Sequence, residues 1–151
     1  MKILAAVDFS PVSTEVLATL RRMAATFPAR VFLVHVASPD PAFVGYEAGP
    51  DAVRGQVAAE HRARHHRLQE LAEGLRSDGV DVTALMLQGA TVATLLAQAE
   101  RLEADLVVLG SHGHRPIYDL LIGSVAEGVV RAGKLPVLLV PAQRATQVSG
   151  T

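Results

Sequence analysis

The chain has 151 residues, of which 50% are hydrophobic and 19% are charged, with a formal net charge of −1 and no cysteine. This length is enough for one domain with a well-buried core, and we expect a single domain over residues 1–142 with a polar tail over residues 143–151. The absence of cysteine excludes disulfides, thiolate catalysis and cysteine-based zinc sites. The near-neutral charge argues against a general nucleic-acid-binding or membrane-binding role. No apolar run is long enough for a signal peptide or a membrane span, so we expect a cytoplasmic protein.

The first predicted strand covers residues 3–7, an apolar run typical of a strand buried on both faces, and Asp8 follows it directly. In open α/β sheets, ligands bind beyond the carboxyl ends of the strands. Asp8 is therefore placed either to accept hydrogen bonds from a ligand or to cap the next helix. Helical apolar spacing predicts that helix up to Phe27, with Ser10 as N-cap and Pro11 as its first residue.

The second predicted strand covers residues 31–36 and contains His35, which we interpret as a strand histidine with a local partner rather than a catalytic residue. A loop rich in proline and glycine follows. A long helix is then expected over residues 52–76, with a basic segment HRARHHR that starts at His61 and continues its inner face. His61 and His65 have the i, i+4 spacing of a helical metal pair. Because no third ligand is evident, we favour a solvated basic face over a partner contact, a phosphate contact or a metal site.

A third strand is predicted over residues 82–87, followed by a third helix with Thr91 as its cap and an apolar stripe along one face. A response-regulator phosphoacceptor has a similar alternation of elements, but it needs an aspartate at the end of this strand. Gln88 and Gly89 stand there instead. This argues against a phosphoacceptor function.

The fourth predicted strand, residues 106–109, ends at Gly110, where the segment GSHGHRPIYDLLIGS begins. Gly110 and Gly113 can take positive φ and have no Cβ, so the neighbouring backbone amides could approach an anion closely. Ser124 is expected to cap the following helix, with Glu127 completing a capping box. Loop amides and helix amides would then converge on one anion, which favours a polyphosphate ligand. The alternative is a strand-to-helix loop that binds nothing.

After this fourth helix, Gly133 is the expected C-cap, and PVLLVP predicts a fifth strand between Pro136 and Pro141. Strands therefore alternate with helices along the whole chain. This alternation predicts an α/β fold, a parallel sheet with right-handed crossovers and helices on both faces.

The spacing of GxxG, nine residues and then GS, which starts at Gly110, resembles the nucleotide-binding signature of the ATP-binding branch of the universal stress protein family. The stretches LLIGSVAEGVVR and PVLLVP are similar to that family too, and the resemblance extends over residues 2–141. Neither a Walker loop nor a dinucleotide-binding fingerprint is present. The resemblance implies an open parallel five-stranded sheet in the order 3-2-1-4-5, of the adenine nucleotide α-hydrolase type. In that order Asp8 and Gly110 would face one crevice.

The resemblance also implies the function of an ATP-binding regulatory module of the stress response, with at most weak ATP hydrolysis. The expected ligand is ATP, or AMP or ADP, with Mg²⁺. The residues implied around adenosine are Ala6, Asp8, Val36 and Leu109. Those implied around the phosphates are Gly110, Ser111, His112, Gly113, His114, Arg115, Gly123, Ser124 and Val125. His114 and Arg115 depart from the small polar residues common at these positions, and no catalytic or metal-ligating residue is assigned.

Two other functions are disfavoured by the sequence. An interaction module that acts without nucleotide is disfavoured by the intact glycine motif, and an adenine-nucleotide-processing enzyme by the absence of HIGH and SGGxDS motifs. The regulated protein is unknown.

In the implied strand order the fifth strand lies at a sheet edge, and an uncharged edge invites pairing with a second copy. We therefore expect a homodimer through Val137, Leu138, Leu139 and Val140.

Overall fold

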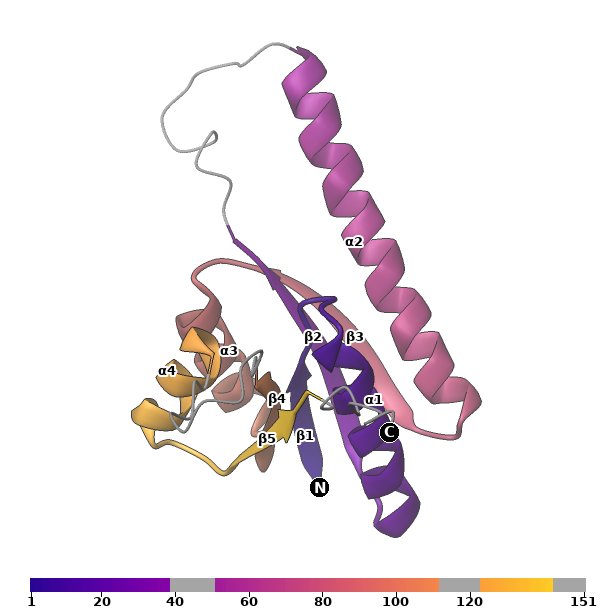
Figure 1. Cartoon of the computed structure of the whole chain (residues 1–151), viewed down its shortest axis with the longest axis vertical. Helices are drawn as coiled ribbons and strands as arrows, with labels where there is room; N and C mark the ends of the chain where they lie inside the picture. Colours follow the sequence, from indigo (N-terminus) through magenta and orange to yellow (C-terminus); the bar gives the residue numbers. More distant parts are fainter. Residues whose placement is uncertain (39–50, 112–122, 143–151) are drawn as a thin grey trace, which may run out of the picture.

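The computed structural model describes residues 1–38, 51–111 and 123–142, with the backbone only for residues 51–53. The predicted tail over residues 143–151 lies outside this part of the chain. Strands and helices alternate as predicted, with boundaries close to the expected ones (Figure 1). The elements are β1 (Lys2–Ala6), α1 (Val12–Thr26), β2 (Arg30–Ala37), α2 (Asp51–Ser77), β3 (Asp81–Gln88), α3 (Thr91–Leu102), β4 (Leu106–Ser111), α4 (Ser124–Ala132) and β5 (Val137–Pro141).

The five strands form one parallel sheet in the order β3-β2-β1-β4-β5, which confirms the expected topology. At its centre, Leu4 of β1 pairs with Phe32 of β2 on one side and with Val107 of β4 on the other. The chain first runs outward from β1 to β3 and then returns to β4. The reversal between β1 and β4 creates the switch point at which open α/β sheets bind ligands.

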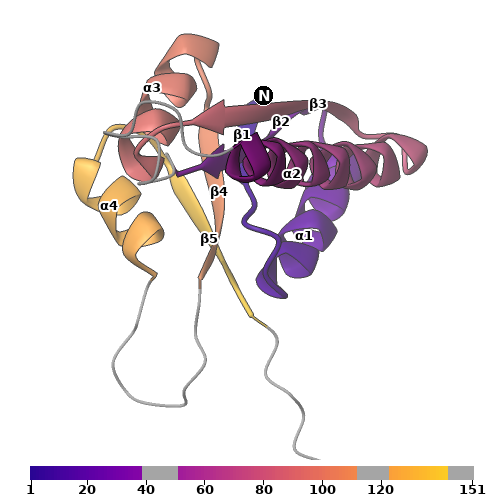
Figure 2. The same cartoon turned by 90° about the horizontal axis from the view of Figure 1, so that it is seen from above.

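Helices cover both faces of this sheet, as predicted (Figure 2). Successive residues of a strand point to opposite faces, so Ile3 and Ala5 pack with α1 and α2 while Leu4 packs with α3 and α4. The side chains of these three β1 residues are all fully buried. β1 is therefore packed on both faces, which explains its continuous apolar sequence.

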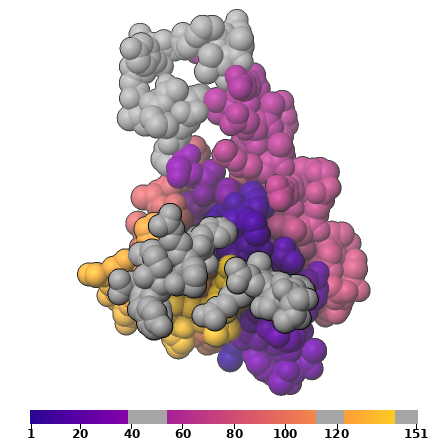
Figure 3. Space-filling view, viewed as in Figure 1, coloured from indigo at the N-terminus to yellow at the C-terminus, as the bar shows by residue number. Residues whose placement is uncertain are grey.

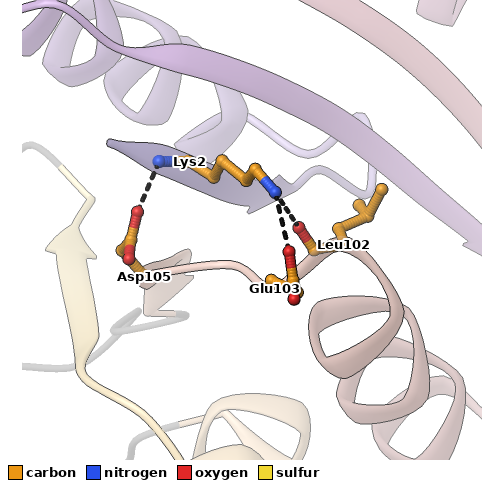
Figure 4. Close-up of polar contacts among 4 residues, drawn as sticks. All are labelled: Lys2, Leu102, Glu103 and Asp105. Carbon is orange, nitrogen blue, oxygen red and sulfur yellow. Dashed lines mark hydrogen bonds and ion pairs between the residues drawn. The ribbon is translucent and has the colours of Figure 1, made fainter.

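A group of polar contacts holds the start of β1 beside the turn between α3 and β4 (Figure 4). The Lys2 amide donates to Asp105 Oδ2 at 2.7 Å, and the Asp105 amide donates to the Lys2 carbonyl at 2.8 Å. Lys2 Nζ also donates to the Leu102 carbonyl at 3.0 Å and lies 3.3 Å from Glu103 Oε2. Because the Lys2–Glu103 ion pair is exposed to solvent, the backbone hydrogen bonds dominate the stabilisation. They set the register of the central pair of strands.

The N-terminal half of α2 extends beyond the other helices and the strands (Figures 1 and 3). Its fully buried side chains, Leu68, Ala72 and Leu75, all lie in the C-terminal half. The prediction that the inner face continues through His61 and Arg64 is wrong, because both side chains are exposed. No cluster of three potential metal ligands occurs among the described residues, so His61 gains no third ligand there. Within the same residues, no helix combines the length and apolar character needed to cross a bilayer.

Two predicted helix caps are also wrong. α1 begins at Val12 with Pro11 in the cap position, and neither this cap nor that of α3 has a side-chain hydrogen bond. The hydroxyl of Ser10 is buried without a hydrogen-bond partner in the described part of the chain. Thr91 is the first residue of α3 rather than its cap, and Ala90 takes the cap position with an extended backbone. α1 therefore begins one residue later than its polar residues suggest, and α3 begins one residue earlier.

Candidate functional site: a cavity at the switch point

A cavity of ≈ 320 Å³ lies at the carboxyl edge of the sheet, where β1 and β4 are neighbours. The ends of β1, β2 and β4 and the first turns of α1, α3 and α4 contribute to its wall. Most of the residues implicated from the sequence meet in this wall. They are Ala6, Asp8, Val36, Leu109, Gly110, Gly123, Ser124 and Val125.

The other implicated residues lie elsewhere or are not described. Ser111 ends β4 and does not line the cavity, and its hydroxyl donates to the Val140 carbonyl at 3.4 Å. His112, Gly113, His114 and Arg115 lie outside the described residues. The described half of the expected phosphate site therefore consists of Gly110 and the start of α4.

Asp8 contacts the start of α1 and also borders the cavity. Its Oδ1 accepts a hydrogen bond from the Ser10 amide at 3.0 Å and from the Ser13 hydroxyl at 3.4 Å, which stabilises the first turn of α1. A carboxylate accepts several hydrogen bonds, so capping the helix is compatible with binding a ligand.

His35 also lines the cavity, and its predicted local partner is confirmed. His35 Nδ1 lies 2.8 Å from the Val7 carbonyl oxygen. Because a carbonyl oxygen only accepts, Nδ1 carries the proton of this hydrogen bond. The imidazole therefore ties the end of β1 to β2.

Gly110 has a packing role that the sequence did not predict. β4 does not stop at this residue but continues to Ser111, because Gly110 pairs with Val140 and Ser111 with Pro141 of β5. Its φ is not positive. A Cβ at this position would lie 2.6 Å from Cγ1 and 3.0 Å from Cγ2 of Val12. The glycine is therefore required by the close packing of α1 against β4.

The predicted capping box at the start of α4 is wrong. Ser124 is the first residue of the helix, Gly123 occupies the cap position, and no side chain caps this end. Glu127 pairs instead with Arg131 one turn later, at 2.7 Å. The expected C-cap is confirmed, because Gly133 ends the helix with φ 60°. The first amides of α4, including those of Ser124 and Val125, have no acceptor within the helix.

The cavity wall contains an acidic side chain and the amino ends of three helices. The first turns of α1, α3 and α4 all reach it, and the amino end of a helix carries partial positive charge. Asp8 is the only acidic or basic side chain, histidine aside, in the described wall. The cavity can therefore accept an anion near α4 and hydrogen-bond donors near Asp8.

The profile of the universal stress protein family matches residues 1–141. The chain belongs to this family. Among its universal stress protein relatives, universal stress protein A homolog 1 of Coxiella burnetii is 34% identical over 139 residues, which are 91% of this chain and 94% of the relative. A solved universal stress protein structure from Burkholderia pseudomallei superposes with a TM-score of 0.69 at 28% identity, over 93% of this chain and 96% of that one.

Two further solved universal stress proteins contain nucleotides. One is in complex with cAMP and has a TM-score of 0.68 at 23% identity, with 95% of this chain and 98% of that chain covered. The other, from Archaeoglobus fulgidus, is in complex with dAMP and has a TM-score of 0.63 at 20% identity, with 93% and 97% covered. At these identities the likeness establishes the shared fold.

Several wall residues of this universal stress protein were not identified from the sequence. Ser13 and Thr91 are polar residues in the first turns of α1 and α3. Both follow the carboxyl ends of strands by a few residues, so the rule that placed Asp8 at the site could also have found them. Val12, Val16, Leu95 and Ala126 form apolar parts of the wall, and their sequence pattern does not distinguish them from core residues.

Proposed function

We propose that this universal stress protein binds ATP, or AMP or ADP, in the cavity between β1 and β4 and acts as a nucleotide-dependent regulatory module. The observation that carries the proposal is the convergence of Asp8, Val36, Gly110 and Ser124 on one cavity. These residues come from four separate parts of the chain. A volume of ≈ 320 Å³ lies within the usual range of small-molecule sites. The cAMP and dAMP complexes of structurally similar proteins support an adenine nucleotide as the ligand.

The charges of the wall define the orientation of the proposed ligand. Phosphates are repelled by the Asp8 carboxylate and attracted by the amino end of α4, where Ser124 and Val125 lie. The adenosine end then lies at Asp8, which can accept hydrogen bonds from ribose hydroxyls or a base amine. Ala6, Val36 and Leu109 supply apolar surface around it. The polyphosphate of ATP would carry Mg²⁺, which binds phosphate oxygens and keeps several waters.

The described wall favours binding over turnover. Phosphoryl transfer needs a group that orients the attacking water and positive charge that neutralises the transferring phosphate. Asp8 lies at the proposed adenosine end, and the Nδ1 proton of His35 is held by Val7. We therefore propose at most weak ATP hydrolysis.

Calorimetry with ATP, AMP and adenosine, with and without Mg²⁺, tests the proposal, together with mass spectrometry of any nucleotide that copurifies. Asp8→Ala should weaken the binding of adenosine and of ATP by similar factors, about 5- to 30-fold, because one or two hydrogen bonds to a charged acceptor are lost. Asp81→Ala is the matched control, because it removes an exposed carboxylate at the opposite edge of the sheet, where β3 begins. Equal affinities of the Asp8 and Asp81 variants, or no adenine nucleotide bound at millimolar concentration, would contradict the proposal.

A further inference from the structure

Phe9, which follows Asp8, has a left-handed backbone with φ 63°. Glu103 at the end of α3 is the only other non-glycine residue with positive φ in the described part of the chain. Large side chains rarely adopt this conformation, because Cβ then lies too close to the neighbouring backbone. Specific contacts must therefore hold Phe9 in it.

Two aromatic contacts hold the Phe9 side chain. Its ring centroid lies 4.5 Å from that of His35 on β2, at an interplanar angle of 33°. The guanidinium carbon of Arg67 on α2 lies 5.2 Å from the centroid of the Phe9 ring, within the range of a cation–π contact. His35 is itself fixed by its hydrogen bond to Val7 at 2.8 Å. The ring thus connects the end of β1 to both β2 and α2.

The backbone of Phe9 determines where the Asp8 carboxylate lies. Asp8 Oδ1 accepts from the amide of Ser10, which stands on the far side of Phe9 in the chain, at 3.0 Å. The torsion angles of Phe9 set the direction of that amide relative to Asp8. If residue 9 left the left-handed region, the amide would turn away and the carboxylate would lose this donor.

We propose that Phe9 and Arg67 are positioning residues for Asp8, through which α2 sets the affinity of the adenosine end of the cavity. This inference rests on the nucleotide binding proposed above and assigns its control to residues outside the cavity wall. The exposed basic segment of α2, residues 61–67, then acts on the site through its last residue, Arg67, and the Phe9 ring.

Replacing Phe9 with alanine or with glycine, the two smallest residues, separates this backbone role from simple packing. Phe9→Ala and Phe9→Gly both remove the ring, but glycine enters the left-handed region about as readily as the right-handed one. Alanine does not. Because apparent affinity falls by the fraction of molecules in the competent conformation, Phe9→Ala should bind adenosine about 5- to 30-fold more weakly than Phe9→Gly. Phe9→Gly should remain within about two- to three-fold of the parent.

Adenosine is the appropriate probe because it carries no charge. Arg67→Ala should weaken adenosine binding by about two- to five-fold, the value of an exposed cation–π contact. Arg64→Ala removes the same charge from the same helix, but its ion pair is with Glu60 at 4.0 Å, so adenosine affinity should not change. Phe27→Ala is the control for ring loss, since Phe27 packs against the same core as Phe9 but at the other end of α1.

A ligand-free measurement completes the test. Hydrogen exchange of the Ser10 amide, followed by NMR, should be faster in Phe9→Ala than in Phe9→Gly or the parent. Equal exchange and equal adenosine affinity in the two Phe9 variants would overturn the positioning role. If the parent binds no adenosine or ATP, the proposed function fails, and the Ser10 amide still decides whether Phe9 positions Asp8. If Arg67→Ala weakens the binding of ATP but not of adenosine, Arg67 acts through its charge, and the proposal that α2 positions Asp8 is wrong.

Discussion

Gly110→Ala tests whether packing explains the glycine in the cavity wall. The new Cβ would lie 2.6 Å from Cγ1 of Val12, a side chain that is 4% exposed and belongs to the first turn of α1. Val12 is β-branched and restricted at χ1, so it has little freedom to turn away. Overpacking of this kind costs about 1–3 kcal/mol, whereas replacing a strand glycine by alanine recovers about 0.5–1 kcal/mol. We expect the free energy of unfolding to fall by about 1–2 kcal/mol and Tm by about 2–8 °C.

Urea unfolding of the single variants and of Gly110→Ala/Val12→Ala measures this clash directly. Val12→Ala removes both methyl groups that the new Cβ would meet, so the double variant should be more stable than the sum of the single losses by about 1–2 kcal/mol. Gly74→Ala on α2 is the control. Its Cβ would meet only Arg21 Nη2, at 3.8 Å, and alanine should stabilise the helix by about 0.5–1 kcal/mol. An unchanged free energy of unfolding in Gly110→Ala, with no coupling to Val12, would refute the packing argument.

The same variants separate packing from ligand approach. If Gly110→Ala/Val12→Ala regains both stability and ATP affinity, the glycine serves only the contact with α1. If it regains stability but not affinity, the methyl group obstructs the ligand, and the glycine serves both.

Two further predictions concern the helix end at Glu103 and the sheet edge at β5. Glu103→Gly should have a free energy of unfolding in urea about 0.5–1 kcal/mol higher than that of Glu103→Ala. Both variants lose the exposed ion pair with Lys2, but only glycine relieves the strain of the positive φ of 53°. Equal stability of the two variants would contradict this prediction. For the edge, we propose a homodimer through β5, whose position beside β4 leaves its other side without a strand partner among the described residues. Leu139→Lys should then shift the sedimenting species from dimer to monomer, with an unchanged circular dichroism spectrum. A parent protein that sediments as a monomer at micromolar concentration, with and without ATP, would exclude this assembly.

The elements of the fold could be predicted from the sequence because each strand is a short apolar run between helical patterns. β1 and β4 are buried on both faces, so their sequences carry no polar interruption to obscure them. The strand order came from family resemblance. Local spacing has no information on which strands become neighbours, since the crossover from β3 back to β4 is decided by packing across the whole sheet.

Helix starts were the weakest predictions, for one common reason. Ser10 and Ser124 each have a residue type that favours the cap position, but the helix begins after a different residue in each case. At Ser10 the amide is held by the Asp8 carboxylate, which takes over the stabilisation of the first turn. At Ser124 the preceding Gly123 already has the extended backbone that a cap needs. Competition between neighbouring polar groups is decided by tertiary geometry, which propensities do not describe.

The conformation of Phe9 could not be inferred from the sequence at all, because its residue type argues against a left-handed backbone. The contacts that hold it come from His35 on β2 and Arg67 on α2, both distant in the chain. The sequence marked His35 as a strand residue and Arg67 as part of a solvated basic face, with no indication that one phenyl ring joins them. The wall of the cavity could thus be predicted from the positions of the strand ends. The proposed control by Phe9 and Arg67, which lie outside that wall, could not be predicted, because it depends on how α2 packs against the sheet.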